Sequence, residues 1–409
     1  MSTYPSVSFD NTKFAFEYKT DSDLKDAKKL FTLMSSPALV KIGTKITPWA
    51  FRAGLPVKNI IKKTIFKQFA GGETLEQTAS VASHLSTYNV QVILDYAVEG
   101  GDDTEPEYDH AADEFIKVIC YAATQPNVPF MSVKVTGLCR EALLERLDEM
   151  IKNLQGSLIK RYLNALEQLP PAEREEWERV RQRLIRICEA ARQNNVGMMI
   201  DAEESWITDP LDALVTLMMD AYNKEKAVVY NTAQMYRHDR LQFVKDCYEA
   251  AVERGFIFAI KLVRGAYMEK ERKRARDLEY LSPIQPDKAA TDADYDAAVQ
   301  FCIERLDKIA VNISTHNEKS NMHALQQLQA NKLPLNHPRV TFSQLYGMSD
   351  NITFNLAHAG CNVSKYLPFG PVEEVIPYLM RRAEENTSVG GNTGREISLI
   401  KKEVKRRKL

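Results

Sequence analysis

The stretch Tyr366–Glu385 reads YLPFGPVEEVIPYLMRRAEE and contains a short strand, a turn and a helix in succession. The strand is expected over residues 362–367 because a Pro/Gly turn follows it, and the helix continues to about Asn386. Pro377 lacks the backbone N–H that an inner helical position needs, so we expect a kink or a late helix start there. Apolar side chains recur at the 3.6-residue period and predict one buried helix face: Val372, Val375, Ile376, Leu379 and Ala383.

A second group of side chains lies beside this apolar face, at positions i, i+3, i+4 and i+7 of the same helix: Tyr378, Arg381, Arg382 and Glu385. Two adjacent arginines suit a planar anion such as a carboxylate or a phosphate, which guanidinium groups bind with paired hydrogen bonds. Taken alone, however, the pattern favours an ordinary surface ion pair between Arg381 and Glu385.

Seven other short apolar runs precede this stretch, and helix-like segments separate them. They predict strands over residues 91–95, 130–136, 197–202, 227–233, 257–263, 309–314 and 339–343. This alternation predicts an α/β fold with a parallel sheet, and eight repeats favour a distorted (β/α)8 barrel of the TIM type over an open sheet. No Gly-x-Gly-x-x-Gly motif follows any of the strands, which counts against a Rossmann dinucleotide-binding half.

The predicted barrel spans residues 89–390, and two further regions flank it. Residues 1–88 read as a helical N-terminal region. Residues 140–195, between the second and third strands, are expected to form an outer helical hairpin and to offer a surface for homo-oligomer formation. Residues 391–409 form a basic tail, for which a solvated helix end is favoured over a weak tether to anionic lipid.

Composition excludes several classes of protein. The 409 residues include 54 Lys and Arg against 55 Asp and Glu, so no overall basic field favours nucleic acid. The six cysteines are scattered singly, which predicts neither a metal site nor disulfides and favours a cytoplasmic location. The acidic N-terminal segment resembles neither a secretory signal nor a transit peptide. Because no run is apolar enough to span a bilayer, we expect at most a peripheral contact at the inner face of a membrane.

Polar residues cluster where the predicted strands end, which in a barrel of this type is where the chemistry occurs. They are Asp95, Lys134, Asp201, Gln234, Lys261, Arg264, Thr315, His316 and Tyr366. Several cations at one edge of the barrel predict a site for an anionic substrate and a phosphate-bearing cofactor. Lys134 lies within an alternating strand pattern, so it is either an ion-paired core residue or a ligand for an anion.

Eight blocks of the sequence resemble the proline dehydrogenases, flavoenzymes that oxidise proline to pyrroline-5-carboxylate. The blocks occur in the order of that family, extend from Phe69 to Asn386 and include the stretch quoted first. The other seven are FAGGET (69–74), ILDYAVEG (93–100), SVKVTGL (132–138), IDAEES (200–205), IKLVRGAY (260–267), STHNE (314–318) and SQLYGM (343–348).

For the substrate, the resemblance implies that Lys134, Arg381 and Arg382 bind the carboxylate of L-proline. It also implies that Asp201 pairs with Tyr366 to shape the pocket, and that Glu99 pairs with the first arginine to close it. The same resemblance places four further side chains in the pocket wall: Leu262, Tyr267, Leu345 and Tyr378.

For the cofactor, the resemblance implies FAD, with Gln234 on the isoalloxazine ring and Lys261, next to Val263, near the flavin N5. Arg264, Gly265 and Ala266 are expected at the pyrophosphate, which the backbone can approach closely at small residues. The adenosine portion is expected to lie against Thr315, His316, Asn317 and Glu385. No metal is expected.

The implied reaction is hydride transfer from proline C5 to flavin N5, the first step of proline catabolism, with the electrons passed on to a quinone. Where this chain has Tyr366, the hydroxyproline dehydrogenases tend to have a small residue, so proline is the expected substrate and hydroxyproline the alternative. Two other classes stay open. One is an aldolase-type barrel that forms a Schiff base through Lys134 or Lys261. The other is a non-catalytic helical scaffold that uses residues 140–195.

Overall fold

The computed structural model describes residues 5–36, 38, 40–41, 57–96, 103–387 and 393–409, and for residues 384–387 and 393 it describes the backbone only. Eight parallel strands form a closed barrel, in which each strand pairs with its sequence neighbours and the last pairs with the first. This confirms the predicted (β/α)8 class. The strands are β1 Val90–Tyr96, β2 Phe130–Val133, β3 Gly197–Ile200, β4 Val229–Gln234, β5 Phe258–Val263, β6 Ile309–Ser314, β7 Val340–Leu345 and β8 Val363–Phe369.

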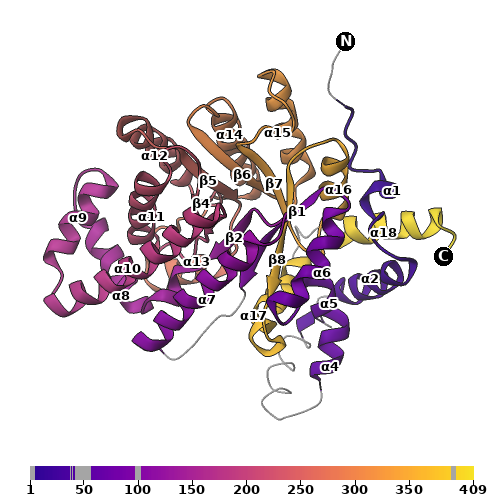
Figure 1. Cartoon of the computed structure of the whole chain (residues 1–409), viewed down its shortest axis with the longest axis horizontal. Helices are drawn as coiled ribbons and strands as arrows, with labels where there is room; N and C mark the ends of the chain where they lie inside the picture. Colours follow the sequence, from indigo (N-terminus) through magenta and orange to yellow (C-terminus); the bar gives the residue numbers. More distant parts are fainter. Residues whose placement is uncertain (1–4, 37, 39, 42–56, 97–102, 388–392) are drawn as a thin grey trace.

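Helices surround the barrel on its outer side (Figure 1). They cover the outer face of strands that are already filled on the inside, so the strands are buried on both faces and read as nearly continuous apolar runs. In chain order they are α7 Glu105–Ala123, α8 Glu141–Lys152, α9 Leu158–Gln168, α10 Pro171–Asn194, α11 Thr208–Tyr222, α12 Arg240–Arg254, α13 Met268–Asp277, α14 Lys288–Ile303, α15 Glu318–Ala330, α16 Asp350–His358 and α17 Val372–Thr387.

Three strand predictions differ from the structure in ways that matter for the site. β2 ends at Val133 because the 3₁₀ helix Val135–Leu138 follows, so Lys134 lies just beyond the strand rather than inside it. β3 likewise ends before Asp201. β8 continues to Phe369, so Tyr366 lies within the strand and not at its end. The late start considered for α17 is wrong, because the helix begins at Val372 and includes Pro377.

The insertion at 140–195 contains three helices, α8, α9 and α10, rather than the predicted hairpin. The break that the prediction missed lies between α8 and α9, where Gly156 adopts a φ of 118° that favours glycine. The predicted break at Pro170-Pro171 is present, with Pro171 at the first position of α10. In Figure 1 the three helices lie together, on the side of the barrel away from the chain ends.

Most of the N-terminal helices pack with the last two helices in a second hydrophobic core, separate from the core of the barrel, whereas the helix over residues 75–86 places Leu75, Ala82 and Leu85 in the barrel core. The N-terminal elements are α1 Thr12–Ala15, α2 Asp21–Met34, α4 Lys58–Ile61, a π-helix Lys62–Phe66, α5 Lys67–Phe69 and α6 Leu75–Ser86. The basic tail forms helix α18, Thr393–Arg406, which lies beside α2 (Figure 1). Its apolar residues Leu399, Ile400 and Val404 are buried, so this helix is packed rather than solvated all round. Among the described residues, no helix combines the length and apolar composition needed to cross a membrane.

Candidate active site

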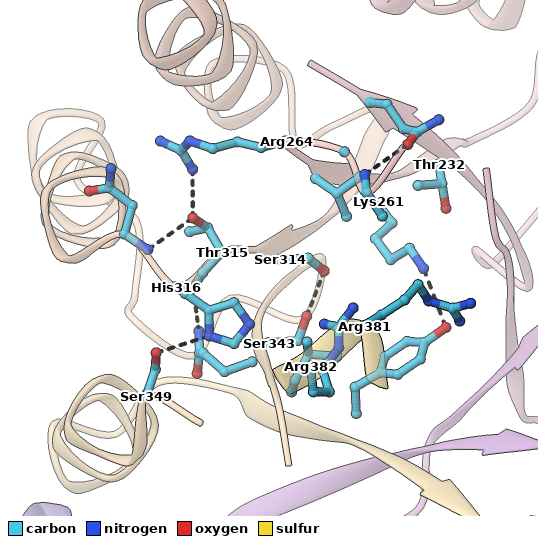
Figure 2. Close-up of a pocket in the computed structure, with 18 of the residues that line it drawn as sticks. Thr232, Lys261, Arg264, Ser314, Thr315, His316, Ser343, Ser349, Arg381 and Arg382 are labelled. Carbon is cyan, nitrogen blue, oxygen red and sulfur yellow. Dashed lines mark hydrogen bonds between the residues drawn. The ribbon is translucent and has the colours of Figure 1, made fainter. Parts of the chain in front are cut away.

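A cavity of about 700 Å³ opens at the carboxyl ends of the barrel strands. Strands β4 to β8, the segments that follow β2, β3, β5 and β6, and the helices α17 and α18 all contribute side chains to its wall. Figure 2 shows cationic groups converging on it from several of these elements. The cavity is therefore where the sequence predicts the chemistry, and charged side chains from several elements line it.

One end of the cavity is formed by Asp201, Lys261 and Tyr366. The Tyr366 hydroxyl donates to the Asp201 carboxylate at 2.7 Å and 2.9 Å from its two oxygens, and Lys261 Nζ forms an ion pair with the same carboxylate. Burial alone would raise the pKa of Asp201, but Lys261 and Lys134 together lower it below its usual value. Burial, followed by the charge of Asp201, raises the pKa of Tyr366, so its hydroxyl keeps its proton as a donor.

Lys134 joins this cluster from the other side. Its Nζ lies 3.4 Å from Asp95 Oδ1 and 3.6 Å from Asp201 Oδ2, and the side chain lines the cavity. The two interpretations left open by the sequence therefore coincide, because Lys134 is ion-paired and also faces the space that a ligand would occupy. Asp95 in turn accepts from the Ser132 hydroxyl at 2.6 Å, which holds that carboxylate in place.

Arg381 and Arg382 reach the same cavity from α17, together with Tyr378. Figure 2 shows both arginine side chains among the residues that line the cavity. The Arg382 guanidinium lies over the Tyr378 ring, 5.1 Å from its centroid, and is buried. Both arginines face the cavity, which is the arrangement the resemblance implied. The side chain of Glu385 lies outside the described residues, as does Glu99.

The opposite end of the cavity is organised by Arg264. Its guanidinium bonds Asp292 at 2.8 Å, Thr315 Oγ1 at 2.6 Å and Ser320 Oγ at 2.8 Å, and it lies over the ring of Tyr295. These contacts orient a cation at the cavity wall. Thr315 Oγ1 also accepts from the backbone N–H of Asn317, and the Asn317 side chain caps the start of α15 (Figure 2).

His316 lies next to this cation, with its Nδ1 2.9 Å from the hydroxyl of Ser349. Burial, followed by the charges of Lys365, Arg382 and Arg264, lowers the pKa of His316 to about 3. The ring is therefore neutral, and the cations around it make this end of the cavity favourable for an anionic group.

Gly265 and Ala266 follow Arg264 and also line the cavity. Gly265 has a φ of 132°, and a Cβ there would lie 2.5 Å from the Tyr236 ring. Glycine is thus required by the close approach of Tyr236 as well as by the backbone conformation. The Ala266 N–H is 3.4 Å from Gln234 Oε1, and Gln234 Nε2 donates to the Glu203 carbonyl at 2.6 Å.

The remaining predicted wall residues divide by side-chain direction. Tyr267, Leu345 and Val263 line the cavity, but Leu262 is not among its lining residues in the described part of the chain. Because side chains alternate along β5, Lys261 and Val263 face inward while Leu262 faces the buried outer side. Leu262 therefore does not line this cavity in the described part of the chain, and its contact with the substrate stays a prediction.

Several lining residues were missed from the sequence. Thr232, Ser314 and Ser343 face inward from β4, β6 and β7, and the alternation from Gln234 and Leu345 could have identified two of them. Ser349, Arg395 and Glu396 line the far end. They come from the start of α16 and from α18, and no pattern in the sequence relates those elements to the barrel.

Together, these observations define a (β/α)8-barrel protein with a cavity at the carboxyl ends of its strands. One end of the cavity is suited to a small anion and the other end to a larger anionic group. In the part of the chain that the structure describes, no group of three or more His, Cys, Asp or Glu side chains is arranged to hold a metal ion.

The model of one protein family, described as proline dehydrogenase, matches residues 78–395. The chain belongs to the proline dehydrogenase family of oxidoreductases.

Several relatives illustrate this membership. The carbapenem antibiotics biosynthesis protein CarD of Pectobacterium carotovorum subsp. carotovorum is 35% identical over 339 residues, which cover 83% of each chain. The mitochondrial proline dehydrogenase 1 of Dictyostelium discoideum is 32% identical over 379 residues, 86% of this chain and 66% of that protein. The hydroxyproline dehydrogenase of Xenopus laevis is 29% identical over 425 residues, 96% of this chain and 88% of that protein.

Among solved structures, proline utilization A from Bdellovibrio bacteriovorus, inactivated by N-propargylglycine, superposes with a TM-score of 0.70 at 19% identity. The match covers 96% of this chain and 40% of that one, so the chain spans well under half of this structural relative. At this identity the likeness shows the fold alone.

Proposed function

We propose that the protein oxidises L-proline to 1-pyrroline-5-carboxylate with FAD as its cofactor. The observation that carries the proposal is the placement of Arg381, Arg382 and Lys134 around one cavity that also contains the Asp201–Tyr366 pair. Membership of the proline dehydrogenase family supports the same reaction class. A small zwitterion with one carboxylate is the kind of substrate that such a set of cations binds.

The substrate end supplies the carboxylate ligands. Arg381, Arg382 and Lys134 can each donate charge-assisted hydrogen bonds, which contribute roughly 1.5–3 kcal/mol each. The rings of Tyr267, Tyr378 and Tyr366 and the Leu345 side chain enclose the rest of a small ring such as that of proline. Held between them, the substrate has few orientations available, and this supports reaction at a single carbon.

The donor set fits FAD at the other end. Arg264 is a fixed cation, Thr315 and Asn317 are polar, and His316 is neutral in electropositive surroundings, a combination suited to phosphates. Gln234, Val263 and Lys261 also line the cavity, and the flavin ring would fit against them. The bound flavin supplies the hydride acceptor.

Asp201 has a structural role in this proposal. Its lowered pKa keeps it ionised, so it holds Lys261 and Tyr366 rather than acting as a base. Lys261 then presents positive charge beside the hydride acceptor, where negative charge would develop. The proline nitrogen must be neutral before hydride leaves C5, so we expect the reaction to speed up as the substrate amine loses its proton.

Two other parts of the proposal concern the electron acceptor and the surface for self-association. Electrons are passed on to a quinone, which would require a cytoplasmic protein to contact the inner face of a membrane. The three helices α8–α10 are the proposed surface for homo-oligomer formation. Both stay proposals that follow from family membership and from the sequence.

Hydroxyproline is the second candidate substrate, because relatives named hydroxyproline dehydrogenase share about 30% identity with the chain. Tyr366 favours proline. Its hydroxyl is already bonded to Asp201, and its ring lines the cavity where a 4-hydroxyl group would need room and a hydrogen-bond partner. An aldolase reaction is less favoured, since Lys134 and Lys261 are both engaged in ion pairs with carboxylates, whereas a Schiff-base lysine has to attack a carbonyl with its free amine.

Purified protein tests the proposal directly. It should be yellow or become so with FAD, and anaerobic addition of proline should bleach the flavin absorbance. Folded protein that remains colourless after incubation with FAD would contradict it.

A further inference from the structure

Helix α18 takes part in the cavity as well as in the terminal core. Arg395 and Glu396, in its first turn, line the far end of the cavity, while Leu399 and Ile400 are buried in the core shared with α2. Arg395 pairs with Glu318 at 2.8 Å and with Asp10 at 2.7 Å, so the helix start is fastened to the wall of the cavity and to the N-terminal segment.

Glu396 links helix α18 to His316 in the cavity wall through Ser349. Its carboxylate accepts the backbone N–H of Ser349, and the hydroxyl of Ser349 lies 2.9 Å from Nδ1 of His316. A continuous chain of hydrogen bonds therefore runs from α18 to a histidine at the cavity wall (Figure 2 shows its Ser349–His316 segment). All three side chains are in the cavity lining.

The segment that contains Ser349 needs such support. Ser349 has a φ of 51°, in the left-handed region that residues with a Cβ adopt reluctantly. Gly347, with a φ of 78°, approaches Gln68 so closely that a Cβ would lie 2.0 Å from the Gln68 carbonyl oxygen. Lys365 Nζ donates to the carbonyls of Leu345 and Met348, at 3.3 Å and 2.5 Å.

This segment, Leu345–Ser349, is thus held by three different parts of the chain: Gln68 from the N-terminal helices, Lys365 from β8 and Glu396 from α18. Of these, Glu396 bonds the residue that contacts His316. The geometry thus connects the His316 ring, through Ser349, to a helix outside the barrel.

We propose that Glu396 is a positioning residue of the cofactor end of the cavity, which acts through Ser349 to fix the orientation of His316. The identity of the ligand rests on the proposed function, whereas the dependence of His316 on Glu396 does not. Helix α18 is on this account a component of the site and not only a C-terminal brace.

Four proteins test the proposal: wild type, Glu396→Ala, Glu396→Gln and Glu403→Ala. Glu403 is the matched control, because it is also a buried carboxylate of α18 but bonds Arg406 and Arg407 at the other end of the helix. The measurements are the dissociation constant for FAD and the NMR signals of the His316 ring nitrogens in the protein without added proline.

We expect Glu396→Ala to raise the dissociation constant for FAD about tenfold, from the loss of one buried hydrogen bond. It should also shift the His316 ring signals. Glu396→Gln keeps an oxygen that can accept from the Ser349 N–H and should restore both readouts, and Glu403→Ala should change neither. Equal effects of Glu396→Ala and Glu403→Ala, or an unchanged His316 signal in Glu396→Ala, would overturn the inference. If wild type bound no FAD, the proposed function would fail, while the His316 signals would still decide the inference.

Discussion

At one end of the cavity Asp201, Lys261 and Tyr366 all lie within or directly after barrel strands, whereas at the other end His316 and Ser349 depend on Glu396, from a helix outside the barrel. The first end is a compact cluster of opposite charges whose carboxylate has a lowered pKa. The second contains a neutral histidine whose Nδ1 contacts the hydroxyl of Ser349. On the proposed function, the end assigned to the substrate is built largely on barrel strands, whereas part of the end assigned to the cofactor depends on a contact between the barrel and helix α18.

Removing a cation from the first end should give the largest effect. Arg381→Met or Arg382→Met should leave the fold and the FAD content intact but raise KM for proline steeply. Loss of one partner of a desolvated charged contact typically costs about 2–5 kcal/mol. Steady-state kinetics with proline measure the change. Wild-type proline kinetics in both variants would place the carboxylate ligands elsewhere.

The pH dependence of protein stability tests whether Glu396, at the second end of the cavity, titrates with a raised pKa. Burial, followed by the charge of Asp350, raises the pKa of Glu396 to about 7 from its usual 4.5, while Lys365 and Lys19 oppose the shift. Between these two values the unfolded chain has lost the proton that the folded protein keeps, so stability falls as pH rises through this interval. Glu396→Gln removes this dependence.

We therefore expect Glu396→Gln to gain stability relative to wild type between pH 5 and 7, by at most about 3 kcal/mol. Urea unfolding of both proteins across this range measures the difference. Burial also raises the pKa of Glu203 and Asp148, to about 7 and about 6, but these groups are present in both proteins and cancel. A stability difference that is independent of pH would rule out titration of Glu396 in this range.

Arg264→Ala tests whether the second end binds the cofactor rather than the substrate. The variant loses a cation at the cavity wall, a contribution of roughly 1.5–3 kcal/mol for one charge-assisted contact. FAD content per polypeptide after gel filtration should fall more than the affinity for proline does. Full FAD occupancy together with a damaged proline constant would reverse the roles assigned to the two ends.

Tyr366→Ser should give the smallest change, in the discrimination between two similar substrates. A polar group buried without a partner costs roughly 1–3 kcal/mol, so wild type should prefer proline over trans-4-hydroxyproline by a factor on the order of ten to a hundred. The serine variant should narrow this gap, chiefly by weakening proline turnover. The comparison of kcat/KM for both substrates decides it, and a wild-type preference for hydroxyproline would invalidate the argument from the tyrosine ring.

The first end was largely predictable from the sequence, because the residues concerned follow strands with clear apolar patterns. Asp201, Lys261 and Tyr366 come together as expected, although Tyr366 lies within β8 and Lys134 beyond β2. Alternation along β5 points Leu262 away from the cavity, so its place in the wall of the substrate pocket stays a prediction.

The second end was only partly predictable. Arg264 and His316 follow strands and were found, but Glu396 contacts Ser349 across 47 positions of the chain. Such a contact depends on how the terminal helices pack against the barrel, and local periodicity carries no information about that packing. The same reason explains the three helices at 140–195 where a hairpin was expected, since their arrangement is set by tertiary contacts and by the turn at Gly156.

Rapid anaerobic mixing of the FAD-loaded protein with L-proline, with and without deuterium at C5, tests the central claim most directly. If the first end orients proline for hydride transfer, flavin absorbance at visible wavelengths bleaches in both cases, and bleaching is slower with the deuterated substrate. The account is contradicted if proline does not bleach the flavin. It is also contradicted if the flavin is bound outside this cavity and Arg381→Met leaves its bleaching by proline unchanged.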